Sequence, residues 1–234
     1  MFSPCIVIPV YKHTDVLAGF IGELKYPLIL VDDGNPDKDL LRGMAEAGGA
    51  ILIVNEKNFG KGYSVMRALD EARARGYTHA LQLDADHQHD LGAIESFLSE
   101  AEKNPAALIN SYPVYDETIP PARLYGRRLT NLWVHIETRS CEIKDAMCGF
   151  RVYPLKETSG INTLFNRMGF DIEILVKASW KGLNIINLPV NVRYPEGGHS
   201  NFRVVADNIK ISFMHTYLFC ASFFMNNRNK NDGS

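Results

Sequence analysis

The N-terminal half of the sequence alternates short apolar runs with segments of helical periodicity, and this alternation limits the fold more than any other feature. The apolar runs span residues 5–10, 28–31, 51–54 and 80–83. Most are apolar throughout, as in strands that are covered on both faces. Helical periodicity occupies residues 39–47, 63–75 and 94–101. This order predicts an α/β fold with a doubly wound, mostly parallel sheet and helices on both faces.

The second half of the sequence is less regular, but it completes the same domain. Strands are predicted over residues 107–111 and 184–192, a turn and strand over 145–153, and helices over 124–137 and 171–181. Pro189 interrupts the last strand, which favours an edge position because proline cannot donate a ladder hydrogen bond. We find no internal repeat and no linker. We therefore expect one domain over residues 1–208, an aromatic segment over 209–225 and a disordered polar tail over 226–234.

Charge and cysteine usage argue against several classes of function. The chain has 25 Lys and Arg residues against 27 Asp and Glu residues, so it lacks the overall positive field that holds a nucleic acid. Its cysteines have no metal-ligand or disulfide spacing; they are Cys5, Cys141, Cys148 and Cys220. The sequence shows neither a signal peptide nor a run of about 18 apolar residues. These observations predict a cytoplasmic protein in a reducing compartment.

Three of the predicted strands end in polar motifs. The motifs are PVYK from Pro9, DDGNP from Asp32 and DADHQ from Asp84. In a doubly wound sheet, ligands bind beyond the carboxyl ends of the strands, and these motifs converge there. The sequence therefore predicts a binding site at this edge of the sheet.

The DADHQ motif has the composition of a metal site. Asp84, Asp86 and Gln88 alternate, so in an extended chain their side chains leave on the same side. Two carboxylates and an amide oxygen suit Mg²⁺ or Mn²⁺ better than zinc and leave positions for water and phosphate. Such an ion would stabilise the charge on a diphosphate leaving group. A solvated acidic loop before a helix is the alternative interpretation.

The other polar residues near these strand ends are less specific. Asp32 and Asp33 precede a Gly-Asn-Pro turn, so they either form the turn or accept hydrogen bonds from a base or ribose. Residues 58–62 (NFGKG) open a helix, where exposed backbone amides and Lys61 favour phosphate. An ordinary helix-entry turn explains the same residues.

Seven ordered motifs resemble family 2 glycosyltransferases of GT-A fold, in particular the branch that transfers mannose or glucose to dolichyl or polyprenyl phosphate. They run from about residue 5 to residue 203 and read PVYKH, VDDGNPD, NFGKGYSVMRAL, LDADHQH, DAMCGFRVY, GFDIEILVKA and LPVNVRYPEGGHSNFR. The resemblance implies an inverting enzyme that uses a nucleoside-diphosphate sugar and holds its metal on the DADHQ run. One departure is Lys12-His13, where the family often has Asn-Glu.

The resemblance also suggests which residues contact the donor. The predicted donor-binding residues are Pro9, Tyr11, Asp32, Asp33, Lys61, Asp84, Ala85 and Arg203. By resemblance, Pro9, Tyr11 and Asp32 surround the nucleobase and ribose, with Asp33 nearby. Arg203 follows a Gly-Gly pair in a segment suited to close over the diphosphate.

The identity of the acceptor is open between two readings. A phosphate acceptor is already anionic and needs cations to position it, which the cluster of Arg123, Arg127 and Arg128 would supply. A hydroxyl acceptor needs a general base, for which the sequence offers Asp145, Asp171 and Glu173. The predicted catalytic residues are accordingly Asp86, Asp145, Glu173 and Arg128. By resemblance, Arg128 matches an arginine that contacts a lipid phosphate.

The aromatic segment 209–225 has two interpretations of equal weight. Its phenylalanines and the flanking basic residues Lys210, Arg228 and Lys230 fit a helix that lies on anionic lipid at the inner face of the membrane. Packing against the domain or a partner subunit fits as well. Two alternative functions fit the whole chain less well. A nucleotidyltransferase would show a Gly-rich loop with Arg after the first strand, and the intact DADHQ run argues against a silent sugar-nucleotide binding module.

Overall fold

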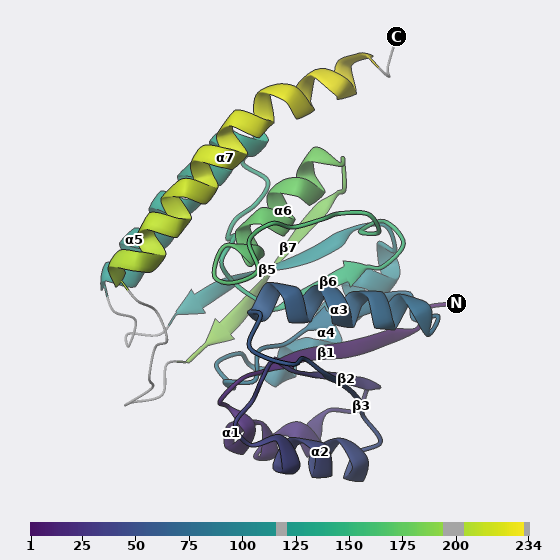
Figure 1. The fold of residues 1–234 in the computed structure, drawn as a ribbon. Coiled ribbons are helices and arrows are strands. Elements are labelled where there is room, and N and C mark those ends of the chain that lie inside the picture. Colours follow the sequence, from purple (N-terminus) through teal and green to yellow (C-terminus); the bar gives the residue numbers. More distant parts are fainter. Residues whose placement is uncertain (116–120, 194–203, 232–234) are drawn as a thin grey trace.

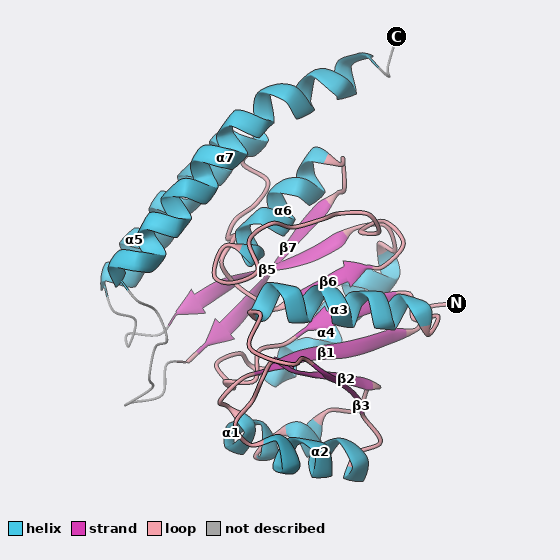
Figure 2. Cartoon of the chain, in the orientation of Figure 1, coloured by secondary structure: helices cyan, strands magenta, loops and turns pink. Residues whose placement is uncertain are grey.

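A seven-stranded sheet with the strand order β3-β2-β1-β4-β6-β5-β7 organises the chain (Figures 1 and 2). The computed structural model describes residues 1–115, 121–193 and 204–231, and it describes side chains over 1–115, 124–193 and 210–225. The strands are β1 (Pro4–Val10), β2 (Leu28–Asp32), β3 (Ile51–Val54), β4 (His79–Gln82), β5 (Leu108–Tyr115), β6 (Arg151–Pro154) and β7 (Ile185–Val192).

The directions of the strands confirm the predicted mostly parallel sheet. β1 pairs in parallel with β2 and β4, β2 with β3, and β5 with β7. β6 lies between β4 and β5 and is antiparallel to both, which the sequence did not predict. β7 lies at the edge of the sheet, as Pro189 indicated.

Helices cover both faces of the sheet, also as predicted. Apolar residues of α1, α2 and α4 form a core with one face, and those of α3, α5, α6 and α7 form a core with the other. In Figure 1, α5 and α7 lie side by side on the outer side of α6. The helices are α1 (Thr14–Ala18), α2 (Lys38–Ala47), α3 (Lys61–Ala74), α4 (Ile94–Lys103), α5 (Pro121–Thr138), α6 (Phe170–Trp180) and α7 (Val204–Asn231), with short 3₁₀ turns η1 (Ile21–Glu23) and η2 (Leu91–Ala93).

The first strand shows why its apolar run does not alternate. Cys5 and Val7 pack into the core on one face of the sheet, and Ile6 and Ile8 pack into the core on the other. All four are completely buried. A strand with a core on each side needs apolar residues at every position, so period-two alternation is lost.

The C-terminal helix corrects two expectations. The expected boundaries at 208/209 and 225/226 both fall inside α7, and the segment from Asn226, which we expected to be disordered, continues this helix to Asn231. Met214 and Leu218 are completely buried against the domain, so α7 is part of the core. Within the described residues, none of the helices is both long enough and apolar enough to cross a membrane.

Candidate active site

The carboxyl ends of β1, β2 and β4 meet at one edge of the sheet. The register of β1 places Val10 beside Asp32 and Val7 beside Gln82, so the three polar motifs that follow these strands converge. This convergence was the central prediction from the sequence, and the structure confirms it. Pro9 and Tyr11 are both half-buried at the end of β1, and Ala85 is buried.

Lys61 joins two carboxylates at this edge. Its Nζ lies 2.8 Å from Asp84 Oδ1 and 2.9 Å from Asp84 Oδ2, and it also lies 2.9 Å from Asp171 Oδ2 on α6. Burial alone would lower the pKa of Lys61, but Asp171 and Asp84 outweigh it and raise the pKa above its ordinary value. The ammonium in turn overcomes the effect of burial on Asp84 and lowers the pKa of that carboxyl. In this arrangement Lys61 is charged and Asp84 is ionised.

Asp86 differs from Asp84 because no described cation contacts its carboxylate. Its Oδ1 accepts a hydrogen bond from the backbone N–H of Gln88 at 3.1 Å. Burial and then the neighbouring charge of Asp84 raise the pKa of Asp86. Two close carboxylates with one countercharge leave local negative charge, which a divalent cation can neutralise.

The donor set at this position fits Mg²⁺ or Mn²⁺. Within the described residues, no group of three or more His, Cys, Asp and Glu side chains is arranged to hold a metal. The residues that would hold such an ion are Asp84 and Asp86, with the amide of Gln88 as the third ligand predicted from the sequence, and further positions would remain for water and phosphate. That is the usual coordination of Mg²⁺, whereas a structural zinc site closes its shell with protein ligands.

A buried polar network beneath the ion pair was missed by sequence reasoning. Gln82 Nε2 donates to Asp171 Oδ1 at 3.2 Å, and Tyr153 Oη donates to Gln82 Oε1 at 2.9 Å. Arg151 is completely buried and donates to the backbone carbonyls of Asp171 and Ala146. Burial raises the pKa of Tyr153 to about 12. The available signal was a glutamine, an arginine and a tyrosine inside otherwise apolar strands.

Asp33 connects the second strand to the glycine loop before α3. Its Oδ1 accepts hydrogen bonds from Asn55 Nδ2 and the N–H of Phe59, and its Oδ2 accepts one from the N–H of Gly60, each at 2.9 Å. The neighbouring Asp32 is buried and accepts a hydrogen bond from the N–H of Asn35 at 2.6 Å. Both aspartates thus form local structure, which the sequence allowed as one of two readings.

The arginines expected to bind the acceptor differ in their surroundings. Arg127 Nη1 lies 2.8 Å from both oxygens of Asp145, so its charge is already neutralised. Arg128, on the next position of α5, is exposed. The side chain of Arg123 and the whole of Arg203 lie outside the described residues.

The carboxylates that were predicted as general bases are engaged in hydrogen bonds and ion pairs. Asp145 Oδ1 also accepts hydrogen bonds from the N–H groups of Met147 and Cys148, at 2.9 and 2.8 Å. Glu173 is completely buried and accepts hydrogen bonds from the N–H groups of Leu164 and Phe165. Lys177 is also 2.6 Å from Glu173. The carboxylates of Glu173 and Asp145 are thus engaged by these contacts, and that of Asp171 is paired with Lys61.

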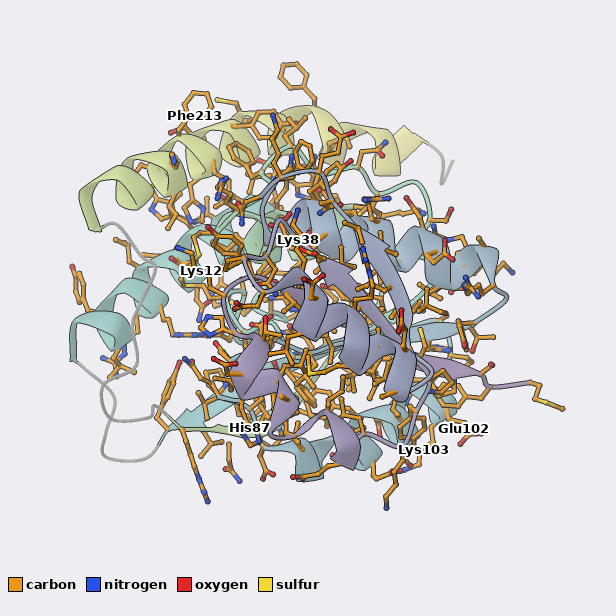
Figure 3. The ribbon with its side chains drawn as sticks, turned by 60° about the horizontal axis from the view of Figure 1, so that its bottom comes forward. Lys12, Lys38, His87, Glu102, Lys103 and Phe213 are labelled. Atoms are coloured by element: carbon orange, nitrogen blue, oxygen red, sulfur yellow. The ribbon has the colours of Figure 1, made fainter. Side chains whose placement is uncertain are left out.

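Large apolar side chains are exposed on both α5 and α7, and we call this set of residues the α5–α7 outer face. On α5, Tyr125 is 72% exposed, and on α7, Phe213 and Phe224 are 68% and 77% exposed. Figure 3 shows Phe213 pointing away from the sheet. The face comprises Tyr125, Leu129, Leu132, Trp133, Ile136, Phe213, Phe223, Phe224 and Met225.

The exposed charged side chains described on α5 and α7 are all basic. Arg128 and Lys210 are exposed, and Arg139, just after α5, lies over the ring of Phe223 at 6.0 Å. Among the described side chains of α5 and α7, the only acid is Glu137, which is buried and 2.7 Å from His215. The α5–α7 outer face is therefore apolar with basic residues around it.

Comparisons with known proteins agree with this geometry. The model of glycosyl transferase family 2 matches residues 5–158. The chain is 23% identical over 211 residues to a polyprenol monophosphomannose synthase from Mycolicibacterium smegmatis, covering 83% of this chain and 79% of that protein.

Solved structures with the same fold include two enzymes of sugar–phosphoglycerate synthesis. A glucosyl-3-phosphoglycerate synthase from Mycobacterium tuberculosis, in complex with Mn²⁺, UDP and glucosyl-3-phosphoglycerate, has a TM-score of 0.66 at 16% identity and covers 94% of this chain and 80% of that one. A mannosyl-3-phosphoglycerate synthase from Rubrobacter xylanophilus has a TM-score of 0.67 at 18% identity, covering 97% and 75%. The fold is thus GT-A-like.

Proposed function

The chain belongs to glycosyltransferase family 2 and is a glycosyltransferase, and we propose that it transfers a hexose from a nucleoside-diphosphate sugar to an acceptor phosphate in a metal-dependent, inverting reaction. The observation that carries this proposal is the arrangement at the end of β4. Asp84 and Asp86 lie there beside Lys61, which begins α3. Carboxylates for a metal and a cation at a helix start are the groups that a diphosphate requires.

The donor half of the reaction is assigned to the first four strands. Asp84, Asp86 and Gln88 would hold Mg²⁺ or Mn²⁺, and the bound ion would neutralise charge on the departing diphosphate. Lys61 would contact the same diphosphate. Asp32 would accept hydrogen bonds from the nucleoside, with Tyr11 beside it at the end of β1.

A phosphate acceptor explains the site better than a hydroxyl acceptor. An oxygen of the acceptor phosphate would attack the anomeric carbon as the bond to the nucleoside diphosphate breaks, and the anion needs no proton removed. A hydroxyl would need a base, yet the carboxylates of Asp145 and Glu173 are engaged by Arg127, by Lys177 and by backbone amides. Of the named relatives, the polyprenol monophosphomannose synthase makes a product with the sugar on a phosphate, whereas the phosphoglycerate enzymes make sugar-3-phosphoglycerates from an acceptor that carries its phosphate at another position.

A lipid-borne phosphate is favoured over a soluble one by the α5–α7 outer face. Exposed aromatic and aliphatic side chains with basic neighbours are typical of surfaces that bind anionic bilayers. α5 begins beyond the carboxyl end of β5, so the helix that carries Arg128 starts at the same edge of the sheet as the site (Figure 1). We propose that the protein binds peripherally to anionic membranes through this face and takes a polyprenyl phosphate.

The proposed function is tested by measuring sugar transfer by the wild type and by a variant that lacks a predicted metal ligand. Transfer from UDP-, GDP- and TDP-hexoses is measured with three acceptors: a polyprenyl phosphate in anionic vesicles, 3-phosphoglycerate and a polyprenol. We expect the polyprenyl phosphate to be used, and Asp86→Asn to lower kcat/KM at least about 100-fold with the fold intact by circular dichroism. Undiminished transfer by the wild type in EDTA would refute the metal-dependent mechanism. Use of 3-phosphoglycerate alone would replace the lipid acceptor with a soluble one.

A further inference from the structure

The ammonium of Lys61 contacts both carboxylate oxygens of Asp84, the first of the predicted metal ligands. Lys61 Nζ lies 2.8 and 2.9 Å from the two oxygens of Asp84, and 2.9 Å from Asp171 Oδ2. The side chains of Lys61 and Asp84 are 26% and 23% exposed, so the contact is largely shielded from water. A divalent cation on Asp84 would lie close to this ammonium, and the two positive charges would repel each other.

The backbone of Gly149 packs closely against one side of the Lys61–Asp84 ion pair. A Cβ added to Gly149 would lie 2.3 Å from Lys61 Nζ, 2.8 Å from Asp84 Oδ2 and 3.0 Å from Gln82 Nε2. Gly149 therefore lies directly against the ion pair, and a side chain at this position would require the ammonium of Lys61 to move. The glycine in the CGF sequence after Cys148 is thus explained by contact with Lys61 and Asp84.

From this geometry we infer that Lys61 is a resident counter-ion of Asp84 that the metal must displace, and that the donor diphosphate is its new partner. The inference rests on the proposed function. Without a metal, Asp84 would be a half-buried carboxylate beside the carboxylate of Asp86, and Lys61 neutralises it. When a metal takes that role, Lys61 loses one partner, and a diphosphate at the start of α3 supplies another.

This exchange makes metal and donor binding cooperative. A metal alone must break the Lys61–Asp84 pair without compensation, so it binds weakly to the nucleotide-free protein. A metal that arrives with a nucleoside diphosphate breaks the same pair, but Lys61 then contacts phosphate. Because coupling between two ligands is reciprocal, the diphosphate alone also binds more weakly than it does with metal present.

The test is the Mn²⁺ affinity of the nucleotide-free protein, measured by calorimetry. Lys61→Met is compared with the wild type and with Lys57→Met, which removes the same charge from an exposed position in the loop that precedes α3. We expect Lys61→Met to bind Mn²⁺ at least about tenfold more tightly than the wild type, and Lys57→Met to match the wild type. We also expect the gain in Mn²⁺ affinity on adding UDP or GDP to be smaller in Lys61→Met.

Equal or weaker Mn²⁺ binding by Lys61→Met would overturn the inference. If that variant is not folded by circular dichroism, Lys61→Gln decides in the same assay, because it keeps a polar N–H donor at this position without a charge. Mn²⁺ binding that is lost in Asp86→Asn but unaffected by Lys61 variants would overturn this inference alone. No Mn²⁺ binding to any variant, with or without nucleotide, would instead overturn the proposed metal-dependent function.

Discussion

The polar strand-end site and the α5–α7 outer face use their side chains in opposite ways. At the strand ends, Asp33 holds backbone amides and Lys61 holds two carboxylates, so the charged groups are fixed by short contacts. On the α5–α7 outer face, Tyr125 and Phe224 are mostly exposed. Fixed polar groups position a small ligand, whereas an exposed apolar face suits a large surface. Under the proposed function, donor and acceptor would be recognised by different physical means.

The strongest test of this division is charge reversal on α5. We expect Arg128→Glu to lower kcat/KM for the polyprenyl phosphate by about 100-fold, close to 3 kcal/mol, because the acceptor anion loses a countercharge and meets a like charge. The affinity for the donor nucleotide should not change. Arg42→Glu, an exposed arginine on α2, is the matched control.

Steady-state kinetics and calorimetry with the same donor measure both effects. A mild Arg128→Glu phenotype, together with loss of turnover in Asp145→Asn, would favour the hydroxyl acceptor instead. A global loss of donor binding in Arg128→Glu would show that the two regions are not independent.

For the donor we expect a smaller effect, a loss of nucleotide affinity when Asp32 at the end of β2 is substituted. Asp32→Ala should weaken nucleotide binding by about 1–3 kcal/mol, because a hydrogen-bond donor of the nucleoside would be left unpaired. Asp37→Ala, which removes an exposed carboxylate from the same loop, should bind nucleotide as the wild type does. The nucleotide affinity is measured by calorimetric titration. Unchanged affinity in Asp32→Ala would show that Asp32 does not contact the nucleotide and only stabilises the turn at Asn35.

The smallest effect is expected on the α5–α7 outer face. Leu132→Glu should weaken binding to anionic vesicles severalfold, by about 1 kcal/mol, because one exposed leucine is 55% accessible and contributes only part of the buried apolar area. Leu40→Glu on α2, 46% exposed, is the control. A point substitution is preferable to removal of α7, because Met214 and Leu218 are in the core.

Sedimentation with vesicles measures this binding. Gel filtration without lipid tests the alternative that a second copy of the chain covers this face. If the wild type is a dimer and Leu132→Glu a monomer, with equal vesicle binding, the face is an interface between subunits and the membrane proposal is wrong.

The N-terminal half of the fold could be predicted because local signals and tertiary structure agree there. Strands such as β1 are buried on both faces, so their apolar runs are unbroken, and parallel pairing brings their polar ends together without further information. The resemblance to family 2 glycosyltransferases added the order of the motifs. The position of the DADHQ run at the end of β4 followed from these two facts.

The remaining features depend on contacts between residues far apart in the sequence. Asp145 and Glu173 were predicted as bases because an acid in a loop or at a helix start has the same local signal whether it is free or paired. Only the fold brings Arg127 to Asp145 and the amide of Leu164 to Glu173. The antiparallel insertion of β6 has the same origin, since strand direction is not encoded in the local sequence of a four-residue strand.

The hydrogen bonds of Asp33 have a consequence for the entropy of donor binding. One carboxylate holds the N–H groups of Phe59 and Gly60 to the end of β2, so the loop before α3 is ordered before any ligand arrives. A flexible loop would lose backbone freedom on binding, and that loss would be subtracted from the affinity. Here the loss is incurred when the protein folds, so the end of β2 and the start of α3, which we propose meet the nucleoside and the phosphates, keep a fixed separation. A donor of the right length would then engage both parts at once, and nucleotides with shorter or longer phosphate chains would be disfavoured by geometry alone.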